Sequence, residues 1–307
     1  MTTKPDNSGL LVIDKPQGVT SHDVVAAVRG ALHMKRVGHA GTLDPMATGV
    51  LPIFVGRATK CCDILPDQNK RYTATFELGY TTDTLDATGR VLTRTPVQAG
   101  KAQVQAALEQ FRGEIMQPPM YSAIQINGRR LYDLARQGIE IEREKRPITI
   151  HHLELLEADE QENRYAIDVA CSKGTYIRTL CADIGEALGC GATMTALRRT
   201  QAAGFSLADS LTLEQAEQLA EQGKLTEHLL QVETVFESLP KIVLCAAQER
   251  MYRNGVRLDL ARLDGMPALG NWAGDIRICG EDGTFLGVSY ADWQQGLLCT
   301  RKLFAVE

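Results

Sequence analysis

Asp44 stands in the segment of this sequence that is best suited to present one reactive side chain. The segment from residue 38 to residue 52 reads Gly-His-Ala-Gly-Thr-Leu-Asp-Pro-Met-Ala-Thr-Gly-Val-Leu-Pro. Glycine permits sharp turns, and Pro45 disfavours helical geometry at the residue before it. We therefore predict a structured loop that displays the Asp44 carboxylate. An isolated Asp-Pro is more often a turn in which the carboxylate bonds its own backbone. The rigidity of this segment and the neighbouring His39 favour a chemical role.

Other common catalytic chemistries lack their sequence patterns here. No phosphate-binding loop of the form GxxxxGKS or GxxxxGKT is present, no GxGxxG follows a strand, and no nucleophile elbow appears. The loop around Asp44 offers no second carboxylate, which a typical glycosidase pair requires. The six histidines are scattered, and His151 and His152 would point to opposite faces of a strand. We therefore expect no metal site.

Composition places the chain among ordinary folded proteins. It has 307 residues, 44% of them hydrophobic and 23% charged, and no apolar run is long enough to span a membrane. Residues 1–8 are polar and lack the apolar core of a signal peptide. The eight cysteines form no CxxC pair, which favours reduced, buried thiols over disulfides or structural zinc. These features predict a cytoplasmic protein without a membrane partner.

The net charge of −5 conceals an uneven charge distribution. Phe205–Pro240 holds seven acidic residues against one lysine, so the rest of the chain is close to neutral. Basic residues cluster locally within that rest, at Lys35-Arg36, Arg129-Arg130 with Arg136, Arg143–Arg146 and Arg198-Arg199. Any one cluster alone is more often solvated surface, but together they are compatible with an RNA partner.

Hydrophobic periodicity predicts the elements that must position these residues. Alternation predicts strands over residues 10–14, 71–78 and 165–171, and helical spacing predicts helices after an N-cap at Ser21, over 104–111 and over 177–188. Because strands and helices mix without a βαβ rhythm, an α+β sheet is expected. Residues 127–145 look like a basic inserted loop or mobile helix, and eight glycines in the last 67 residues suggest a small β domain.

The loop from Gly38 to Pro52 resembles the catalytic loop of the TruB-type tRNA pseudouridine synthases, which make pseudouridine-55 in the tRNA T arm. Four further stretches resemble that family in the same order, so the likeness covers roughly residues 9 to 205. They are Leu11–Gly18 (LVIDKPQG), Lys70–Tyr72 (KRY) with Leu78-Gly79 and Thr82–Asp86 (TDTLD), Cys171–Arg178 (CSKGTYIR), and Leu197–Thr200 (LRRT).

The resemblance implies a fold and a reaction. The fold would be an α+β pseudouridine synthase fold, with a central mixed, largely antiparallel sheet flanked by helices. The domains implied are residues 1–240, catalytic, with a basic RNA-binding insert at about 127–146, and residues 241–307, a β-rich PUA-like RNA-binding domain. The enzyme would isomerise uridine without a cofactor, through a carboxylate that serves as nucleophile or as base. A monomer without an obligatory protein partner is expected.

The family pattern also implies roles for residues at the reacting base. Asp44 matches the catalytic aspartate, and Arg178 matches the arginine that keeps this aspartate ionised and aimed. Tyr72 matches the aromatic residue that stacks on the target base. Tyr176 and Leu197 match positions that line the uracil pocket. By local sequence alone, Arg178 would pass for a helix-surface residue and Tyr72 and Leu197 for core.

Further residues match positions that contact the RNA. His39 matches the histidine that stacks on the opened RNA once the target uridine has left its stack. Lys15 matches a lysine near the active site, and a phosphate contact and a purely structural role are equally open for it. The insert with Arg129, Arg130 and Arg136 resembles a loop that folds against the T arm, although its composition also suits a surface loop without function.

Two other functions compete with a stand-alone tRNA enzyme. One is the catalytic subunit of a guide-RNA-directed complex, which shares the aspartate loop; the basic insert and the lack of a long extra tail argue against it. The other is a non-catalytic RNA-binding or RNA-folding factor. The presence of Asp44, Tyr72 and Arg178 argues against that function, because a pure binder has no need of a carboxylate facing phosphates.

Overall fold

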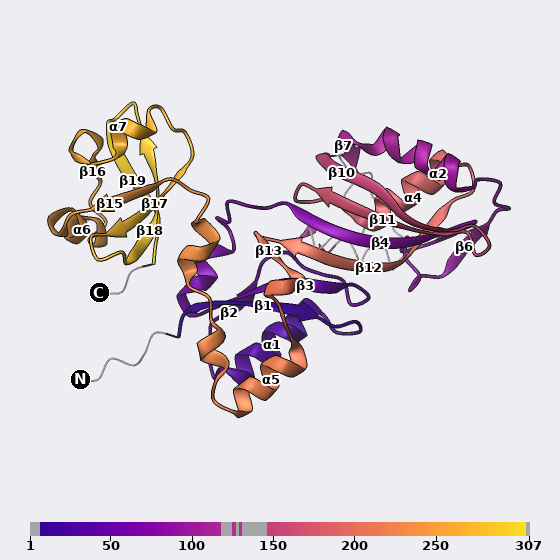
Figure 1. Ribbon diagram of the computed structural model, residues 1–307, viewed down its shortest axis with the longest axis horizontal. Coiled ribbons are helices and arrows are strands. Elements are labelled where there is room, and N and C mark those ends of the chain that lie inside the picture. Colours follow the sequence, from indigo (N-terminus) through magenta and orange to yellow (C-terminus); the bar gives the residue numbers. More distant parts are fainter. Residues whose placement is uncertain (1–6, 118–124, 127–128, 131–145, 305–307) are drawn as a thin grey trace.

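One large mixed sheet organises most of the chain and carries the loop around Asp44 (Figure 1). The computed structural model describes residues 7–117, 125–126, 129–130 and 146–304. The 10-stranded sheet has the order β14-β1-β3-β12-β4-β11-β10-β7, with β2 added to β3 and β13 to β12. Its strands are β1 (Gly9–Lys15), β2 (Val37–His39), β3 (Thr48–Val55), β4 (Lys70–Leu78), β7 (Gly113–Gln117), β10 (Arg146–Asp159), β11 (Arg164–Cys171), β12 (Ala192–Ala202), β13 (Phe205–Ser206) and β14 (Leu211–Thr212).

Antiparallel pairs dominate this sheet. Among its described strands, only β1–β14 and β3–β12 run parallel. The helices that pack on it are α1 (Ser21–Ala31), α2 (Lys101–Leu108), α4 (Ile177–Ala187) and α5 (Leu213–Glu221). Two short hairpins accompany it, β5 (Tyr80–Thr82) with β6 (Val91–Arg94) and β8 (Gln125–Ile126) with β9 (Arg129–Arg130). The α+β class with a mixed, largely antiparallel sheet is therefore confirmed.

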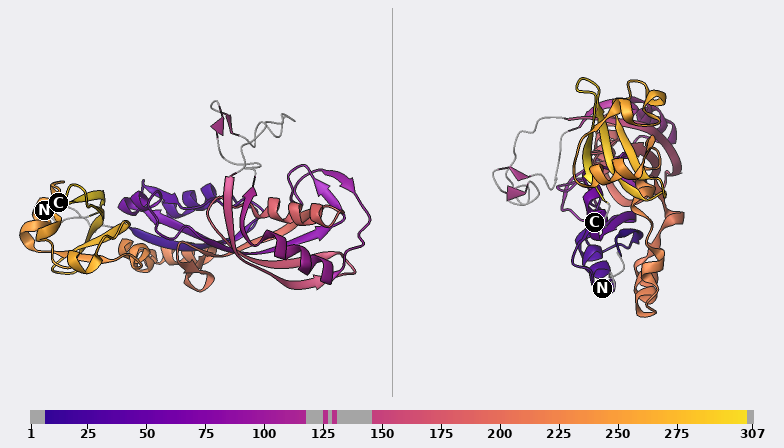
Figure 2. Two further views of the ribbon diagram at one scale, coloured as in Figure 1. Left: turned by 90° about the horizontal axis from the view of Figure 1, so that it is seen from above. Right: turned by 90° about the vertical axis from the view of Figure 1, so that its left-hand side faces the viewer.

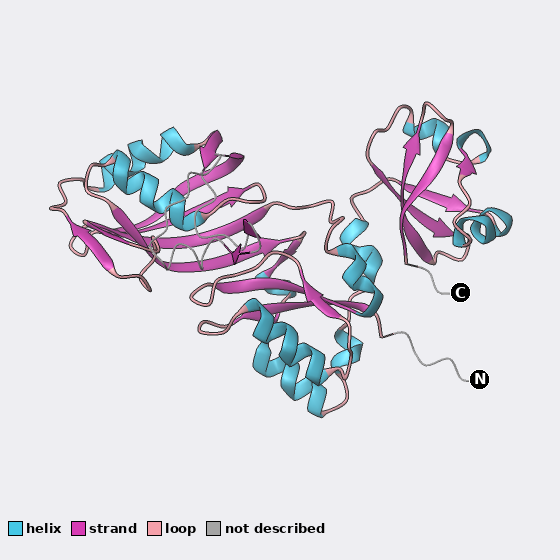
Figure 3. Cartoon of the chain, turned by 180° about the vertical axis from the view of Figure 1, so that it is seen from behind, coloured by secondary structure: helices cyan, strands magenta, loops and turns pink. Residues whose placement is uncertain are grey.

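The half of the sheet around β4, β11 and β10 packs its apolar face under α2 and α4. Alternate residues of β4, from Tyr72 to Leu78, are buried, as a period of two on a half-covered strand requires. They join Leu180 and Ile184 of α4 and Val104 of α2 in one hydrophobic cluster. Figure 3 shows both helices on the same side of this half. The first turn of α4 is thereby fixed over the sheet.

The other half of the sheet is covered on both faces, so β1 is a continuous apolar run. Leu10 and Val12 enter a cluster with Phe236, while Leu11 and Ile13 pack with Val24 of α1. The 3-10 helices here are η1 (Gly56–Cys61), η3 (Leu207–Asp209), η4 (Leu225–His228) and η5 (Val232–Phe236), and η2 (Glu109–Phe111) follows α2. Figure 1 shows α1 and α5 side by side against this half. The end of β1 is thereby held rigid.

A second, five-stranded sheet begins at Lys241 and has its own hydrophobic cluster (Figure 2). Its order is β15-β17-β18-β19-β16, and its elements are β15 (Lys241–Leu244), α6 (Ala246–Arg253), β16 (Leu258–Asp259), η6 (Leu260–Arg262), α7 (Met266–Leu269), β17 (Asp275–Gly280), β18 (Phe285–Asp292) and β19 (Leu297–Leu303). The ring of Phe236 stacks on Phe285 at 5.6 Å, and Lys302 pairs with Asp63 at 2.8 Å. An apolar contact to η5 and an ion pair to the segment after η1 therefore join the second sheet to the rest of the chain.

Three local expectations are corrected. The segment 38–52 is a loop only between His39 and Thr48, because β2 and β3 occupy its ends. The N-cap of α1 is Thr20, whose side chain accepts from the Asp23 amide, and Ser21 is the first helical residue. Phe111 lies in η2, beyond the end of α2. Among the described residues, no helix has the length and apolar character needed to cross a membrane.

Candidate active site

The loop between β2 and β3 is fixed at several backbone points, which makes Asp44 a pre-positioned carboxylate. Buried Ser21 at the start of α1 accepts from the Leu43 amide at 2.8 Å and donates to the Leu43 carbonyl at 3.0 Å. The Gly18 amide donates to the Pro45 carbonyl at 2.8 Å, and the Ala47 amide to the Asp44 carbonyl at 3.0 Å. The sequence predicted only a capping role for Ser21 and did not indicate its two hydrogen bonds to the backbone of Leu43.

Asp44 and Arg178 meet, as expected from the resemblance. Nη2 of Arg178, on the first turn of α4, lies 3.2 Å from Oδ2 of Asp44. The Asp44 side chain is 41% exposed, whereas that of Arg178 is only 11% exposed. A guanidinium held in a fixed plane orients a carboxylate better than a mobile ammonium does. Arg178 therefore orients the Asp44 carboxylate, which stays partly exposed to a substrate.

Asp86 completes a chain of three charges that sequence reasoning did not assign. Its Oδ2 lies 3.4 Å from Nη1 of Arg178, and its side chain is only 5% exposed. Its Oδ1 also accepts from the Thr84 hydroxyl at 2.8 Å and from the Thr88 amide at 3.0 Å. Asp86 thus holds one terminal nitrogen of Arg178 while Asp44 contacts the other. The Thr82–Asp86 stretch carried part of the resemblance, but nothing in its local pattern indicated this role.

The turn that bears Asp86 is itself fastened to β12. The Met194 amide donates to the Leu85 carbonyl at 3.1 Å, and the Ala87 amide donates to the Met194 carbonyl at 2.9 Å. Leu85 has a φ of 63°, in the left-handed region that costs an L-residue energy. The surrounding hydrogen bonds hold this strained turn and with it the backbone that carries Asp86.

Lys15 is fully buried at the end of β1, where it joins backbone rather than solvent. Its Nζ donates to the carbonyls of Pro16 at 2.9 Å, Val19 at 2.8 Å and Pro45 at 3.5 Å. Burial lowers the pKa of Lys15 to about 8, and the charge of Asp44 opposes that shift. Of its two open roles, this geometry supports the structural one, because the ammonium fastens the Asp44 loop to the turn after β1.

Tyr72 lies on β4 within the core, beside the Asp44 loop. Its side chain is 6% exposed and clusters with Leu43, Met46 and Ala47. Burial raises the pKa of Tyr72 to about 12, although the nearby charge of Arg199 opposes this effect. The ring is therefore a neutral, apolar surface next to Asp44, which is the character that a stacking partner requires.

The two remaining expected base-contacting residues lie at the start of α4 and on β12. Tyr176 is the N-cap of α4, and buried Gln117 fixes it by donating to its carbonyl at 3.0 Å and accepting from its amide at 2.7 Å. Half-buried Leu197 on β12 pairs in register with Ala74. Gln117 gave no sequence signal, because its partners are backbone atoms distant along the chain.

His39 and the described residues of the expected RNA insert lie on short strands. His39 ends β2, its Nδ1 is buried without a hydrogen-bond partner in the described structure, and burial lowers its pKa. Arg129 and Arg130 form β9, which pairs with β8. Arg136 lies outside the described residues, as does most of the insert. Within the described ranges, no three His, Cys, Asp or Glu side chains gather as metal ligands.

The chemistry available here is that of one aimed carboxylate beside an apolar wall. Asp44 alone of the two carboxylates on Arg178 is open, while Asp86 is closed inside the protein. The Asp44 carboxylate can attack or deprotonate a substrate carbon. The other carboxylate that contacts Arg178, Asp86, is buried and therefore cannot activate a water molecule for hydrolysis. This suits an intramolecular rearrangement better than a hydrolysis.

Comparison with solved structures defines the class of fold. A Cbf5–Nop10–Gar1 complex matches with a TM-score of 0.75 and 24% identity, covering 97% of this chain and 85% of that one. An archaeal box H/ACA Nop10–Cbf5 complex matches with a TM-score of 0.72 and 25% identity, covering 97% and 86%. The chain therefore has the pseudouridine synthase fold of these proteins.

Sequence comparison gives the family. The model of the TruB family pseudouridylate synthase N-terminal domain matches residues 29–177, and that of the tRNA pseudouridylate synthase B C-terminal domain matches 178–237. The tRNA pseudouridine synthase B of Alkaliphilus oremlandii is 46% identical over 82% of this chain and 83% of its own length. That of Aeromonas salmonicida is 42% identical over 97% and 94%. The chain belongs to the TruB family of pseudouridylate synthases.

Proposed function

We propose that this enzyme isomerises uridine-55 in the T arm of tRNA to pseudouridine, with Asp44 as the catalytic carboxylate. The observation that carries the assignment is the Asp44–Arg178 pair at the edge of an apolar wall. The names of the relatives, tRNA pseudouridine synthase B over most of the chain, support the substrate class. A tRNA-modifying enzyme works where its tRNA is, which makes the cytoplasm the expected compartment.

The reaction needs no atom from outside. The C1′–N1 bond breaks, the uracil turns over, and C1′ rejoins at C5, which releases the C5 hydrogen as a proton. Asp44 acts as nucleophile or as base toward the ribose, and Arg178 keeps the carboxylate charged and aimed. The detached base must be shielded from water, or the intermediate would hydrolyse. Tyr72 stacks on the base, while Tyr176 and Leu197 border it.

Access to the target requires the RNA to open. A stacked loop uridine must leave its stack at a cost of roughly a few kcal/mol. His39 stacks on the opened RNA and offsets part of that cost. Arg129, Arg130 and Arg136 of the insert contact T-arm phosphates. Residues 241–307, which begin with the second sheet, form a PUA-like domain that adds RNA contacts.

The enzyme acts alone rather than with a guide RNA. Near full-length identity of 42% to a bacterial tRNA pseudouridine synthase B favours this arrangement, whereas the likeness to Cbf5 complexes concerns the fold. The test is to add the purified chain, without other proteins or RNA, to a tRNA transcript labelled with tritium at uridine C5. Tritium release with modification mapped to position 55 supports the proposal. Release only after a guide RNA and partner proteins are added would overturn it.

A further inference from the structure

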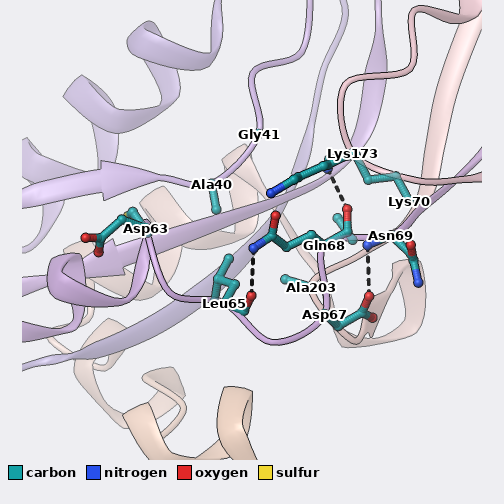
Figure 4. Close-up of a pocket in the computed structure, with 12 residues that line it drawn as sticks. Ala40, Gly41, Asp63, Leu65, Asp67, Gln68, Asn69, Lys70, Lys173 and Ala203 are labelled. Carbon is teal, nitrogen blue, oxygen red and sulfur yellow. Dashed lines mark hydrogen bonds between the residues drawn. The ribbon is translucent and has the colours of Figure 1, made fainter. Parts of the chain in front are cut away.

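A pocket of about 220 Å³ lies beside the Asp44 loop, on the side of Gly41 (Figure 4). Its walls come from the start of the loop, the segment between η1 and β4, the turn before α4, and the end of β12. Figure 4 shows Lys70, Lys173, Gln68 and Asn69 gathered around it. None of the residues assigned above to the reacting base lines it. The pocket is thus a separate feature that adjoins the active site.

Two cationic side chains meet at Gly41, and a third lines the same pocket. A Cβ added to Gly41 would lie 3.1 Å from Cε of Lys70 and 3.3 Å from Nη1 of Arg199. Nη2 of Arg199 donates to the Gly41 carbonyl at 2.9 Å, and exposed Lys173 lines the same pocket. Because Gly41 has no side chain and a φ of +79°, the side chains of Lys70 and Arg199 can approach its backbone. The glycine therefore permits an unusual concentration of positive charge.

This positive charge is poorly compensated within the described structure. Lys70 donates to the Gln68 carbonyl at 2.9 Å and makes no ion pair there. Arg199 is fully buried and donates to the carbonyls of Val50 and Gly41, and its further side-chain partner is the uncharged hydroxyl of Tyr72. Burial and then the charge of Arg199 lower the pKa of Lys70, and the charge of Asp67 opposes this shift only in part. Cationic groups close together without a counter-charge repel one another, and a bound anion would remove this free-energy cost.

The nearby carboxylates do not supply that anion. Asp63 pairs with Lys302 of the second sheet at 2.8 Å. Asp67 is exposed and accepts from the Asn69 amide at 2.9 Å, which closes its own turn. The pocket consequently offers two lysine ammoniums to an incoming group, and the buried guanidinium of Arg199 lies against Gly41 in its wall. Phosphate oxygens are the groups of RNA that such ammoniums bind.

We propose that this pocket binds a backbone phosphate of the RNA, through Lys70 and Lys173, next to the target uridine. Gly41 precedes Asp44 by three residues, a span of at most about 10 Å. The phosphate therefore belongs to the target nucleotide or to one close to it along the strand. This site deepens the proposed function, on which it rests, and fixes the strand so that C1′ of the target faces Asp44.

The first test measures tRNA affinity over a salt series for Lys173→Gln and Lys70→Gln. Each variant should bind about tenfold more weakly and lower the log–log salt slope by about one unit, the effect of one lost phosphate contact. Lys224→Gln, the same change at an exposed lysine beyond α5, is the matched control and should follow the parent. Because the Lys173 side chain is exposed, its variant reports on binding even if Lys70→Gln folds poorly. Salt curves of Lys173→Gln that superimpose on the parent's would overturn the proposal.

A second test identifies the phosphate. T-arm RNAs that carry one neutral methylphosphonate at successive positions around uridine-55 are bound to the parent and to both variants. At one position the substitution should weaken parent binding about tenfold and have little further effect in the variants, because the contact is already lost. Full additivity at every position would contradict a phosphate contact. Tritium release by the parent is scored separately, so failure of the proposed function is distinguishable from failure of this site.

Discussion

At the scale of single residues, Arg178 should act through Asp44 rather than through RNA binding. Arg178→Ala should lower the single-turnover rate at least about a hundredfold, because misplacing the carboxylate by about 1 Å has that effect. Affinity for tRNA should change far less. Arg178→Lys should recover only part of the rate, since one ammonium cannot hold Asp44 and Asp86 in the planar geometry observed.

The measurement for Arg178 is single-turnover kinetics at saturating tRNA, with binding measured in parallel. Normal turnover by both the Ala and the Lys variants would show that Arg178 is a structural residue. A loss of affinity equal to the loss of rate would assign it to RNA capture instead.

Lys15 should give the folded protein a distinctive dependence on pH. Its pKa is lowered by burial to about 8, from an ordinary value of 10.5. Between these values the unfolded chain binds more protons at this residue than the folded one, so the free energy of unfolding rises with pH. Below about pH 8 both states are charged, and the cost of burying the charge is fully present.

Lys15→Met removes this contribution. Urea unfolding of parent and variant between pH 7.5 and 10.5 should show the parent gaining stability relative to the variant across that window. Two stability curves that stay parallel would mean that Lys15 keeps an ordinary pKa. The variant should also lose activity, because the Asp44 loop loses its link to the turn after β1.

At the scale of elements, the contact between β3 and β12 depends on the absence of a side chain at Gly49. A Cβ there would lie 2.1 Å from the Arg199 carbonyl oxygen, and the φ of Gly49 is +107°. Gly49→Ala should therefore destabilise the fold by about 2 kcal/mol or more. Gly113→Ala, where φ is +88° and no atom lies within 4 Å, isolates the backbone strain and should cost less. Equal losses of stability in the two variants would contradict a packing role for Gly49.

Some elements were predictable from sequence because one face is buried. Alternation in β4 and β11 and the apolar stripe of α4 reported their positions directly. The strands β2 and β3 were missed because glycine and proline there indicated a loop. Pro52 has no amide to donate, yet it stays within β3 and its carbonyl accepts from the Ala40 amide. Pairing with distant strands places these residues in the sheet, and the local sequence pattern does not show such pairing.

The site was predictable in part for a related reason. Asp44 and Arg178 came from ordered motifs, and the structure brings them together. Ser21, Asp86 and Gln117 position the site through backbone atoms or through Arg178, at separations of 22, 92 and 59 residues. Such partners share no local spacing, so only the folded chain displays them.

At the scale of the whole molecule, tRNA capture should involve regions away from Asp44. Replacing Arg129, Arg130 and Arg136 with Ala should weaken tRNA affinity and lower the log–log salt slope by about one unit for each lost phosphate contact. The single-turnover rate at saturating tRNA should fall much less. Affinity measured across a salt series compares the triple variant with the parent. If the salt dependence of tRNA affinity is the same for the triple variant and the parent, tRNA binding depends on the core and the second sheet instead.

Tritium release from C5-labelled uridine in a tRNA transcript shows whether Asp44 is the catalytic carboxylate of the whole enzyme. Asp44→Asn keeps the size and polarity of the side chain but removes the charge that attacks or deprotonates the ribose. We expect no detectable release by this variant, with tRNA binding largely retained. The control Asp282→Asn, at an exposed turn of the second sheet, should match the parent. Release by Asp44→Asn near the parent rate would contradict the assignment.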